Sequence, residues 1–181
     1  MVYAKNEMID ARNVSDEFKG LAHDDIVAEL DKRGITLEIA IENTLRDFNM
    51  GTIVRSANAF GVRHVHVIGR KQWNKRGAMA TDKYLYVHYY TTPEEFSREM
   101  KVQRKVIIAI ENNVASEPLA ATPLPKNAVF IFGQEGPGIS PELLVVADKV
   151  AHIEQFGSTR SVNVGVASGI AMYEWLKANL L

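Results

Sequence analysis

The chain of 181 residues contains no cysteine, which excludes a disulfide framework and a cysteine nucleophile. It has no run of 18 consecutive apolar residues, and its first 20 residues lack the apolar centre of a signal peptide. These absences lead us to expect a cytoplasmic protein without a membrane span. The sequence also lacks a strong net charge, because it contains 21 Lys and Arg residues and 22 Asp and Glu residues. A nucleic-acid partner would therefore require a local basic patch.

Two parts are expected along the chain. Residues 1–35 contain eight acidic and five basic residues and form an acidic extension. In this extension, Asp24 is a suitable N-cap for a short helix that stops at Gly34. Residues 36–181 form the main domain, and because 46% of the sequence is hydrophobic, a chain of this length can bury a core without disulfides or metal ions.

Strand-like and helix-like segments alternate through the main domain. Strands are predicted at 36–41, 65–68, 106–110, 128–132 and 150–153. Helices are predicted from about 50 to 60, from 93 to 104, from Pro141 onward, and from Ser161 to about Asn179. Apolar strands that alternate with helices are typical of an α/β fold. We therefore predict a mostly parallel sheet covered by helices on both faces.

The segment 43–61 contains the first residues with functional potential. Asn49 is placed as the N-cap of the helix that follows, and Ile53, Ala57 and Phe60 form the buried stripe of that helix. Arg55 lies about 200° around the helix from Ile53, so it points away from this stripe. On pattern alone, Arg55 is either an ordinary exposed arginine or a residue with a function.

The segment PheGlyGlnGluGlyProGlyIleSer at 132–140 directly follows an apolar strand. Three glycines and a proline at the carboxyl end of a parallel strand predict a tight turn or a close approach of the backbone to a ligand. The spacing Gly-x-x-Gly-x-Gly is not the dinucleotide fingerprint GxGxxG, and the segment lacks the Lys-Ser/Thr pair of a P-loop. A nicotinamide-dependent oxidoreductase and a nucleoside triphosphatase are therefore disfavoured. Glu135, in the middle of the segment, has no evident structural role.

The segment 159–171 opens the last predicted helix. Ser161 is a suitable N-cap for this helix. Gly165, Ser168 and Gly169 are small, so they permit the close approach of another backbone. This segment is either a site of tight helix packing or a helix terminus that faces a ligand.

Taken together, the three segments resemble the motifs of the SpoU family of RNA ribose 2′-O-methyltransferases, within the SPOUT superfamily. The motifs are Asn49-x5-Arg55, GlyGlnGluGlyProGly at 133–138, and ArgSerValAsnValGlyValAlaSerGly at 160–169. The resemblance covers about residues 36–181. It implies S-adenosylmethionine as methyl donor, a homodimer, and a deep trefoil knot in the C-terminal part. The implied substrate is RNA, with tRNA as the first choice and rRNA as the alternative.

The resemblance also assigns roles to individual residues. Arg55 matches the catalytic arginine of the family, and other family site positions match Asn49, Glu135, Ser161 and Asn163. The donor-binding positions match Ile110, Gly133, Ile153 and Ser161. A guanidinium stays protonated in proteins, so we interpret Arg55 as a fixed cation that stabilises the developing alkoxide and pairs with a neighbouring phosphate.

Residues 61–84 carry a local excess of positive charge that suits RNA. Six basic residues in this stretch are the predicted RNA contacts: Arg63, Arg70, Lys71, Lys75, Arg76 and Lys83. Only Asp82 opposes them, and Trp73 and Tyr84 lie between them. Basic side chains contact phosphates and aromatic rings stack on unpaired bases, a combination typical of binding to single-stranded or loop RNA. A solvated loop is the alternative interpretation.

Two further questions are left by the sequence. His64 and His66 share one strand face, but no third ligand lies near them in sequence, so we expect no metal site. The alternative to an enzyme is a catalytically inactive protein of the same fold that binds RNA or the methyl donor.

Overall fold

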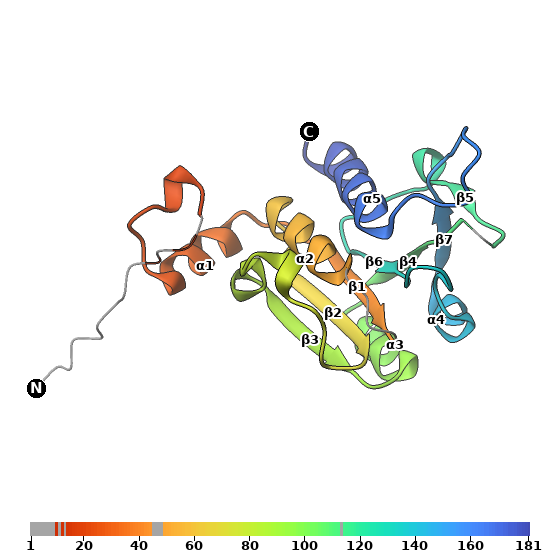
Figure 1. The fold of residues 1–181 in the computed structure, drawn as a ribbon, viewed down its shortest axis with the longest axis horizontal. Coiled ribbons are helices and arrows are strands. Elements are labelled where there is room, and N and C mark those ends of the chain that lie inside the picture. Colours follow the sequence, from red (N-terminus) through yellow and green to blue (C-terminus); the bar gives the residue numbers. More distant parts are fainter. Residues whose placement is uncertain (1–9, 11, 13, 45–48, 113) are drawn as a thin grey trace, which may run out of the picture.

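Seven strands form one sheet in the computed structural model, which describes residues 10, 12, 14–44, 49–112 and 114–181 (Figure 1). The strands are β1 (Glu38–Asn43), β2 (His64–Gly69), β3 (Tyr86–Tyr90), β4 (Val106–Ile110), β5 (Glu117–Pro118), β6 (Ala128–Phe132) and β7 (Lys149–His152). Their order across the sheet is β3-β2-β1-β6-β4-β7-β5, and each pair of neighbours is parallel. This arrangement confirms the α/β fold with a parallel sheet.

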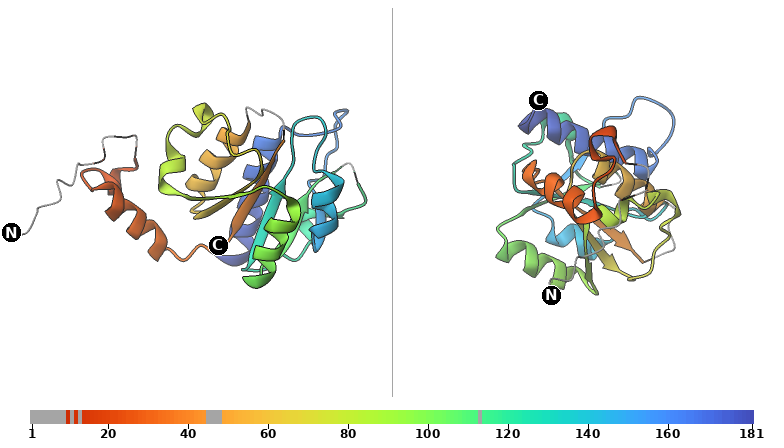
Figure 2. Two further views of the ribbon diagram at one scale, coloured as in Figure 1. Left: turned by 90° about the horizontal axis from the view of Figure 1, so that it is seen from below. Right: turned by 90° about the vertical axis from the view of Figure 1, so that its left-hand side faces the viewer.

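Helices cover both faces of the sheet, as predicted (Figures 1 and 2). On one face lie α2 (Asn49–Ala59) and α5 (Val164–Asn179), and on the other lie α3 (Pro93–Val102) and α4 (Pro141–Val146). Because successive strand residues point to opposite faces, Ile108 packs in the cluster under α2 and α5, whereas Ile107 packs in the cluster under α3 and α4. The carboxyl ends of all these parallel strands lie at one edge of the sheet.

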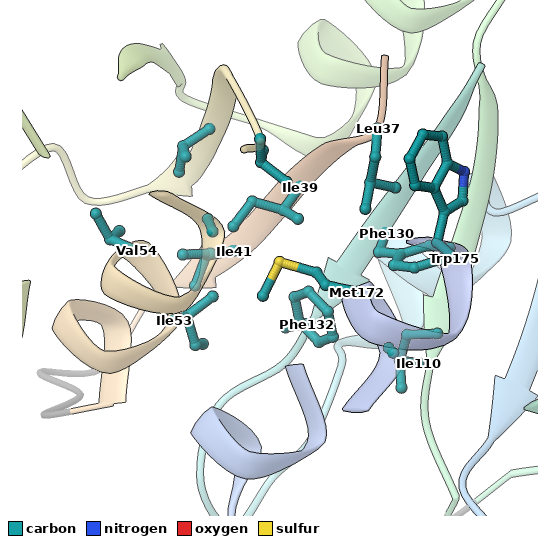
Figure 3. Packing of buried hydrophobic residues seen from close by; sticks show 14 of the residues in the cluster. Leu37, Ile39, Ile41, Ile53, Val54, Ile110, Phe130, Phe132, Met172 and Trp175 are labelled. Carbon is teal, nitrogen blue, oxygen red and sulfur yellow. The ribbon is translucent and has the colours of Figure 1, made fainter. Parts of the chain in front are cut away.

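The larger hydrophobic cluster lies between the sheet and the helices α2 and α5 (Figure 3). Ile53 of α2, Phe132 of β6, and Met172 and Trp175 of α5 are each at most 1% exposed. The indole Nε1 of Trp175 also donates a hydrogen bond to the carbonyl oxygen of Pro125 at 2.9 Å. This packing fixes the starts of both helices near the carboxyl ends of β1 and β6.

Several strands differ from the sequence prediction, and the two-residue strand β5 is one that it lacks. β1 begins at Glu38 rather than at residue 36, and Glu38 is buried because its carboxylate pairs with His66 Nε2 at 2.7 Å and Lys105 Nζ at 2.5 Å. β3 was not predicted at all. It is an edge strand whose tyrosines are partly exposed, with Tyr86 at 41% and Tyr89 at 38%, so it forms no continuous apolar run.

Three predicted helix caps are wrong, and one of them is Asn49, which is the first residue of α2 and not its N-cap. The helix α1 (His23–Lys32) has Ala22 at its N-cap, so Asp24 lies inside the first turn. The helix α5 begins at Val164 with Asn163 as its N-cap, not Ser161. The predicted stop at Gly34 is confirmed by a positive φ of 69°, which favours glycine.

The described part of the extension packs near the β3 end of the sheet (Figures 1 and 2). Asp10 accepts hydrogen bonds from Arg12 and from the hydroxyl of Tyr84, the latter at 2.7 Å. The hydrogen bond from Arg12 holds the pKa of Asp10 well below its usual range, and burial raises the pKa of Tyr84 to about 12. Residues 1–9, 11, 13, 45–48 and 113 lie outside the described residues.

Candidate active site

A cleft opens where β4, β6 and β7 end and α5 begins. Its volume is about 700 Å³, counting the open mouth. The residues that line it are Ile110, Glu111, Asn112, Gly133, Gln134, Glu135, Gly136, Gly138, Ile153, Gln155, Ser161, Val162, Asn163, Val164 and Ala167. The mixture of apolar walls with a few polar groups is typical of a small-molecule site.

All four residues predicted to hold the donor border this cleft, namely Ile110, Gly133, Ile153 and Ser161. Ile110 is the last residue of β4, Gly133 directly follows β6, and Ile153 directly follows β7. Because β4 lies between β6 and β7 in the sheet, their ends meet here. Ser161 lies in the segment that leads from β7 into α5.

The glycines of segment 133–140 make a closed turn. The backbone amide of Gln134 donates to the carbonyl oxygen of Gly138 at 3.0 Å, and the amide of Gly138 donates to the carbonyl oxygen of Gln134 at 3.1 Å. A Cβ atom added at Gly133 would lie 2.3 Å from the carbonyl carbon of Gly138. Gly136 and Gly138 have positive φ angles of 92° and 75°. The space beside Gly133 is therefore filled by its own turn, and a larger residue there would break the turn.

Two buried glutamates, which the sequence analysis missed, hold this turn in place. The Oε2 atom of Glu111 accepts a hydrogen bond from the backbone amide of Ile139 at 2.9 Å. The Oε2 atom of Glu42 accepts one from the amide of Ser140, also at 2.9 Å. The signal in the sequence was a glutamate directly after an apolar run, Glu42 after residues 39–41 and Glu111 after residues 106–110. Charged side chains are rarely buried unless they are paired or hydrogen-bonded.

Asn163 joins the three sequence motifs. Its Nδ2 atom lies 3.1 Å from Oδ1 of Asn49 in α2 and 2.8 Å from Oε1 of Glu135 in the glycine turn, and it donates to both. Its Oδ1 atom accepts hydrogen bonds from the backbone amides of Gly165 at 2.9 Å and Val166 at 3.3 Å. One side chain thus caps α5 and connects it to the other two motifs.

The helices α2 and α5 approach each other closely beside the hydrogen-bonded residues Asn49, Glu135 and Asn163. A Cβ atom added at Gly165 would lie 2.9 Å from Cγ2 of Thr52, so only glycine fits there without a shift. Arg55 lies almost one turn beyond Thr52 in the same helix and is exposed. It does not line the cleft, and it makes no ion pair with any residue the structure describes. The structure therefore brings Asn49, Glu135, Ser161 and Asn163 to the cleft or its border and leaves Arg55 in solvent.

Gln155 is a cleft residue that the sequence analysis did not single out. It follows Ile153 by two positions and lines the β7 side of the cleft. Its Oε1 atom is buried and has no hydrogen-bond partner within the described ranges. A buried polar atom without a partner costs free energy, so it marks a position where a ligand donor would be stabilising.

The predicted RNA contacts divide into two groups. Arg70, Lys71, Lys75, Arg76 and Lys83 are exposed. Arg63 is not, because its side chain is 6% exposed and its Nε atom lies 2.7 Å from Oδ1 of Asp31 in α1. Tyr84 is also buried, so it is not a free stacking surface. Tyr89 offers one instead, since it is 38% exposed and Nζ of Lys71 lies 5.2 Å from its ring centre.

Three histidines stack between β2 and β3, away from the cleft. Nδ1 of His64 and Nε2 of His88 are 2.9 Å apart, and the ring of His66 stacks on that of His88 with 5.0 Å between centroids. Burial lowers the pKa of His64 and of His88. Among the described residues, no three His, Asp or Glu side chains are grouped to hold a metal ion. Nor is any helix in this part of the chain long and apolar enough to cross a membrane.

Comparison with known proteins identifies the family. A tRNA (guanosine(18)-2′-O)-methyltransferase of Aquifex aeolicus is 30% identical over 149 residues, which cover 80% of this chain and 71% of that protein. A 23S rRNA (guanosine-2′-O-)-methyltransferase of Bordetella pertussis is 26% identical over 178 residues, covering 86% of this chain and 71% of that protein. The crystal structure of the Aquifex aeolicus TrmH/SpoU tRNA-modifying enzyme superposes with a TM-score of 0.73 and 26% identity, over 86% of this chain and 83% of that one. The model of the SpoU rRNA Methylase family matches residues 36–173. This chain is therefore a member of the SpoU rRNA methylase family.

Proposed function

We propose that this protein transfers a methyl group from S-adenosylmethionine to a ribose 2′-hydroxyl of RNA, with tRNA as the first candidate substrate. One relative named above is a tRNA 2′-O-methyltransferase and another acts on 23S rRNA, so rRNA is the second candidate. The observation that carries the proposal is the hydrogen-bonded group of Asn49, Glu135 and Asn163 at the border of the cleft. This group joins all three motifs of the family in one place.

The residues of the cleft fit such a donor. No Lys, Arg or His lines it within the described chain, and Glu111 and Glu135 contribute carboxylates, which suit a sulfonium cation and not a phosphate. Ile110 and Ile153 supply apolar surface for a nucleobase, and the unpartnered Oε1 of Gln155 accepts a hydrogen bond from a ligand. S-adenosylmethionine, when bound, supplies an electrophilic methyl carbon on its sulfur.

Arg55 acts as a fixed cation in this proposal. Its guanidinium cannot accept the hydroxyl proton, because it stays protonated in proteins. It stabilises the negative charge that develops on the ribose oxygen and pairs with the adjacent phosphate. Asn49, Glu135, Ser161 and Asn163 hold the segments that border the cleft. Their geometry orients the reacting groups, which contributes to the rate through proximity.

A homodimer is part of the same proposal. Val166, Ile170 and Tyr173 lie at positions i, i+4 and i+7 of α5 and are 53%, 37% and 48% exposed. They form an apolar stripe on the outer side of the helix, which a second copy of the chain would cover. Because Arg55 does not line the cleft of its own chain, we propose that a dimer through this face brings Arg55 to a donor site.

The RNA is held by exposed basic residues at the carboxyl end of β2 and in the loop that follows. Arg70, Lys71, Lys75, Arg76 and Lys83 remain the proposed phosphate contacts, and Tyr89 joins them as a stacking surface. Arg63 is not among the proposed phosphate contacts, because its guanidinium forms an ion pair with Asp31. The domain boundary at residue 36, the trefoil knot and a cytoplasmic location stay predictions within this proposal.

Transfer of a labelled methyl group tests the activity. The purified protein is incubated with tRNA or rRNA and labelled S-adenosylmethionine, and the digested RNA is analysed by mass spectrometry. We expect one labelled 2′-O-methyl nucleoside. Isothermal titration with S-adenosylhomocysteine and with NADH distinguishes a methyl-donor site from a nicotinamide site. Binding of S-adenosylhomocysteine without label in either RNA would contradict the enzyme and support an inactive donor-binding protein.

A further inference from the structure

The two sides of the cleft differ in chemistry. The strand order β6-β4-β7 places the segment after β6 on one side and the segment after β7 on the other. On the β6 side, Glu135 and Asn163 make the polar group that joins the motifs. On the β7 side, Ile153 and Gln155 line the wall, and Ile110 at the end of β4 lies between the two sides.

This asymmetry orients a bound nucleoside with a charged tail. The reacting end must lie near the polar group on the β6 side, where the family motifs meet. The flat, largely apolar end then lies on the β7 side, against Ile110 and Ile153. A nucleobase carries its hydrogen-bonding groups at its edge, so its edge meets the side chain beyond Ile153, which is Gln155.

Gln155 has an unused hydrogen-bond acceptor at this position. Its Oε1 atom is buried without a partner among the residues described, although the side chain lines the cleft. An amide oxygen accepts hydrogen bonds, and the matching group on a purine edge is an exocyclic amine. An apolar side chain at position 155 would stack on a base equally well and would leave no polar atom unpaired. The buried amide oxygen is therefore favourable only when a ligand donates a hydrogen bond to it.

We propose that Gln155 reads the 6-amino group of the adenine in the methyl donor and so selects an adenosyl ligand. The inference rests on the proposed function, because it takes the ligand to be S-adenosylmethionine. It adds a side chain that determines specificity for the base and has no part in the chemistry of methyl transfer. Gln155 therefore affects donor affinity more than the rate of the bound complex.

The test compares two ligands by isothermal titration. One is S-adenosylhomocysteine, and the other is its 6-desamino analogue, in which hydrogen replaces the amino group of the purine. We expect the unaltered protein to prefer S-adenosylhomocysteine by about tenfold or more, because the analogue leaves a buried acceptor unpaired. The Gln155→Met variant keeps the length of the side chain but removes the amide, so its preference is expected to fall to about twofold or less.

Two further variants complete the design. Gln155→Glu keeps an oxygen acceptor at the same position, so it should retain a preference for the amine. Gln103→Met, at the exposed end of α3, is the matched control and should behave like the unaltered protein. If Gln155→Met fails to fold, Gln155→Leu takes its place. An unchanged preference in Gln155→Met would overturn the role of Gln155 alone, whereas an unaltered protein that binds neither ligand would overturn the proposed function.

Discussion

Asn163 and Asn49 are 114 positions apart in the sequence, yet Nδ2 of Asn163 donates a hydrogen bond to Oδ1 of Asn49 at 3.1 Å. The same nitrogen lies 2.8 Å from Glu135, while the amide oxygen of Asn163 caps α5. The nitrogen and the oxygen of the Asn163 amide therefore have different roles. The oxygen stabilises a helix, and the nitrogen sets the relative positions of α2, the glycine turn and α5.

Substitutions of Asn163 separate these two contributions. Asn163→Asp keeps an oxygen for the cap but loses the donor and places a second carboxylate beside Glu135. We expect the free energy of unfolding to fall by less than in Asn163→Ala, which loses the cap at a cost of about 1 kcal/mol. Methyl transfer is expected to be impaired in both variants. Urea unfolding and methyl-transfer assays measure the two effects, and a fully active Asn163→Asp would contradict the positioning role of the nitrogen.

Arg55→Ala tests the proposed cation. We expect methyl transfer to be lost by a factor of about 100 or more, because one preorganised charge at a developing oxyanion contributes on that order. Affinity for S-adenosylhomocysteine should stay within a few-fold, since the proposed partners of Arg55 are the ribose oxygen and the phosphate of the RNA, not the donor. Arg98→Ala, an exposed arginine of α3, is the matched control. Near-normal turnover in Arg55→Ala would show that another group stabilises the ribose oxygen.

Much of this arrangement could be predicted from local pattern. The alternation of apolar strands with helices, the Gly34 stop and the glycine-rich turn at 133–138 all depend on signals a few residues long, whereas Ile153 was placed at the donor site only by the family resemblance. The cap of α5 differs from the prediction because Ser161 and Asn163 are both good N-cap residues, and Asn163, which serves as the cap, is also held by the distant Asn49 and Glu135. Likewise, the local sequence around Arg63 indicates an exposed arginine, but in the structure its side chain is buried and pairs with Asp31 of α1. These errors concern contacts between distant segments, which no local pattern encodes.

The basic loop after β2 is expected to hold RNA through phosphate contacts. Replacing Lys75 and Arg76 by alanine should weaken RNA binding and lower the slope of log affinity against log salt by about 1 to 2. Lys75 contributes the smaller share, because its Nζ atom already pairs with Asp82 at 2.7 Å. Replacing Arg98 and Lys101 on α3 by alanine is the control of equal charge. Filter binding at several salt concentrations measures the slope, and equal slopes for both variants would remove the proposed RNA contact.

The stacked histidines give the fold a dependence on pH below about 6.5. Burial lowers the pKa of His64 and His88, so the unfolded chain, in which histidine titrates near 6.5, binds protons before the folded one as the pH falls. Their contribution is complete above pH 6.5 and is lost as the pH falls toward the folded values.

The carboxylate of Glu38 does not contribute to the change in the free energy of unfolding just below pH 6.5. Hydrogen bonds and charge from His66 and Lys105 outweigh the burial of Glu38 and lower its pKa to about 2, so its contribution is lost only below about pH 4.5. Urea unfolding at pH 7.5, 6.0 and 5.0 should show a falling free energy of unfolding. His88→Gln should flatten this slope, because it removes one titrating ring and the partner of His64, whereas Lys101→Gln on α3 should not. A free energy that is constant from pH 7.5 to 5.0 would mean that both histidines are protonated as easily in the folded chain as in the unfolded one.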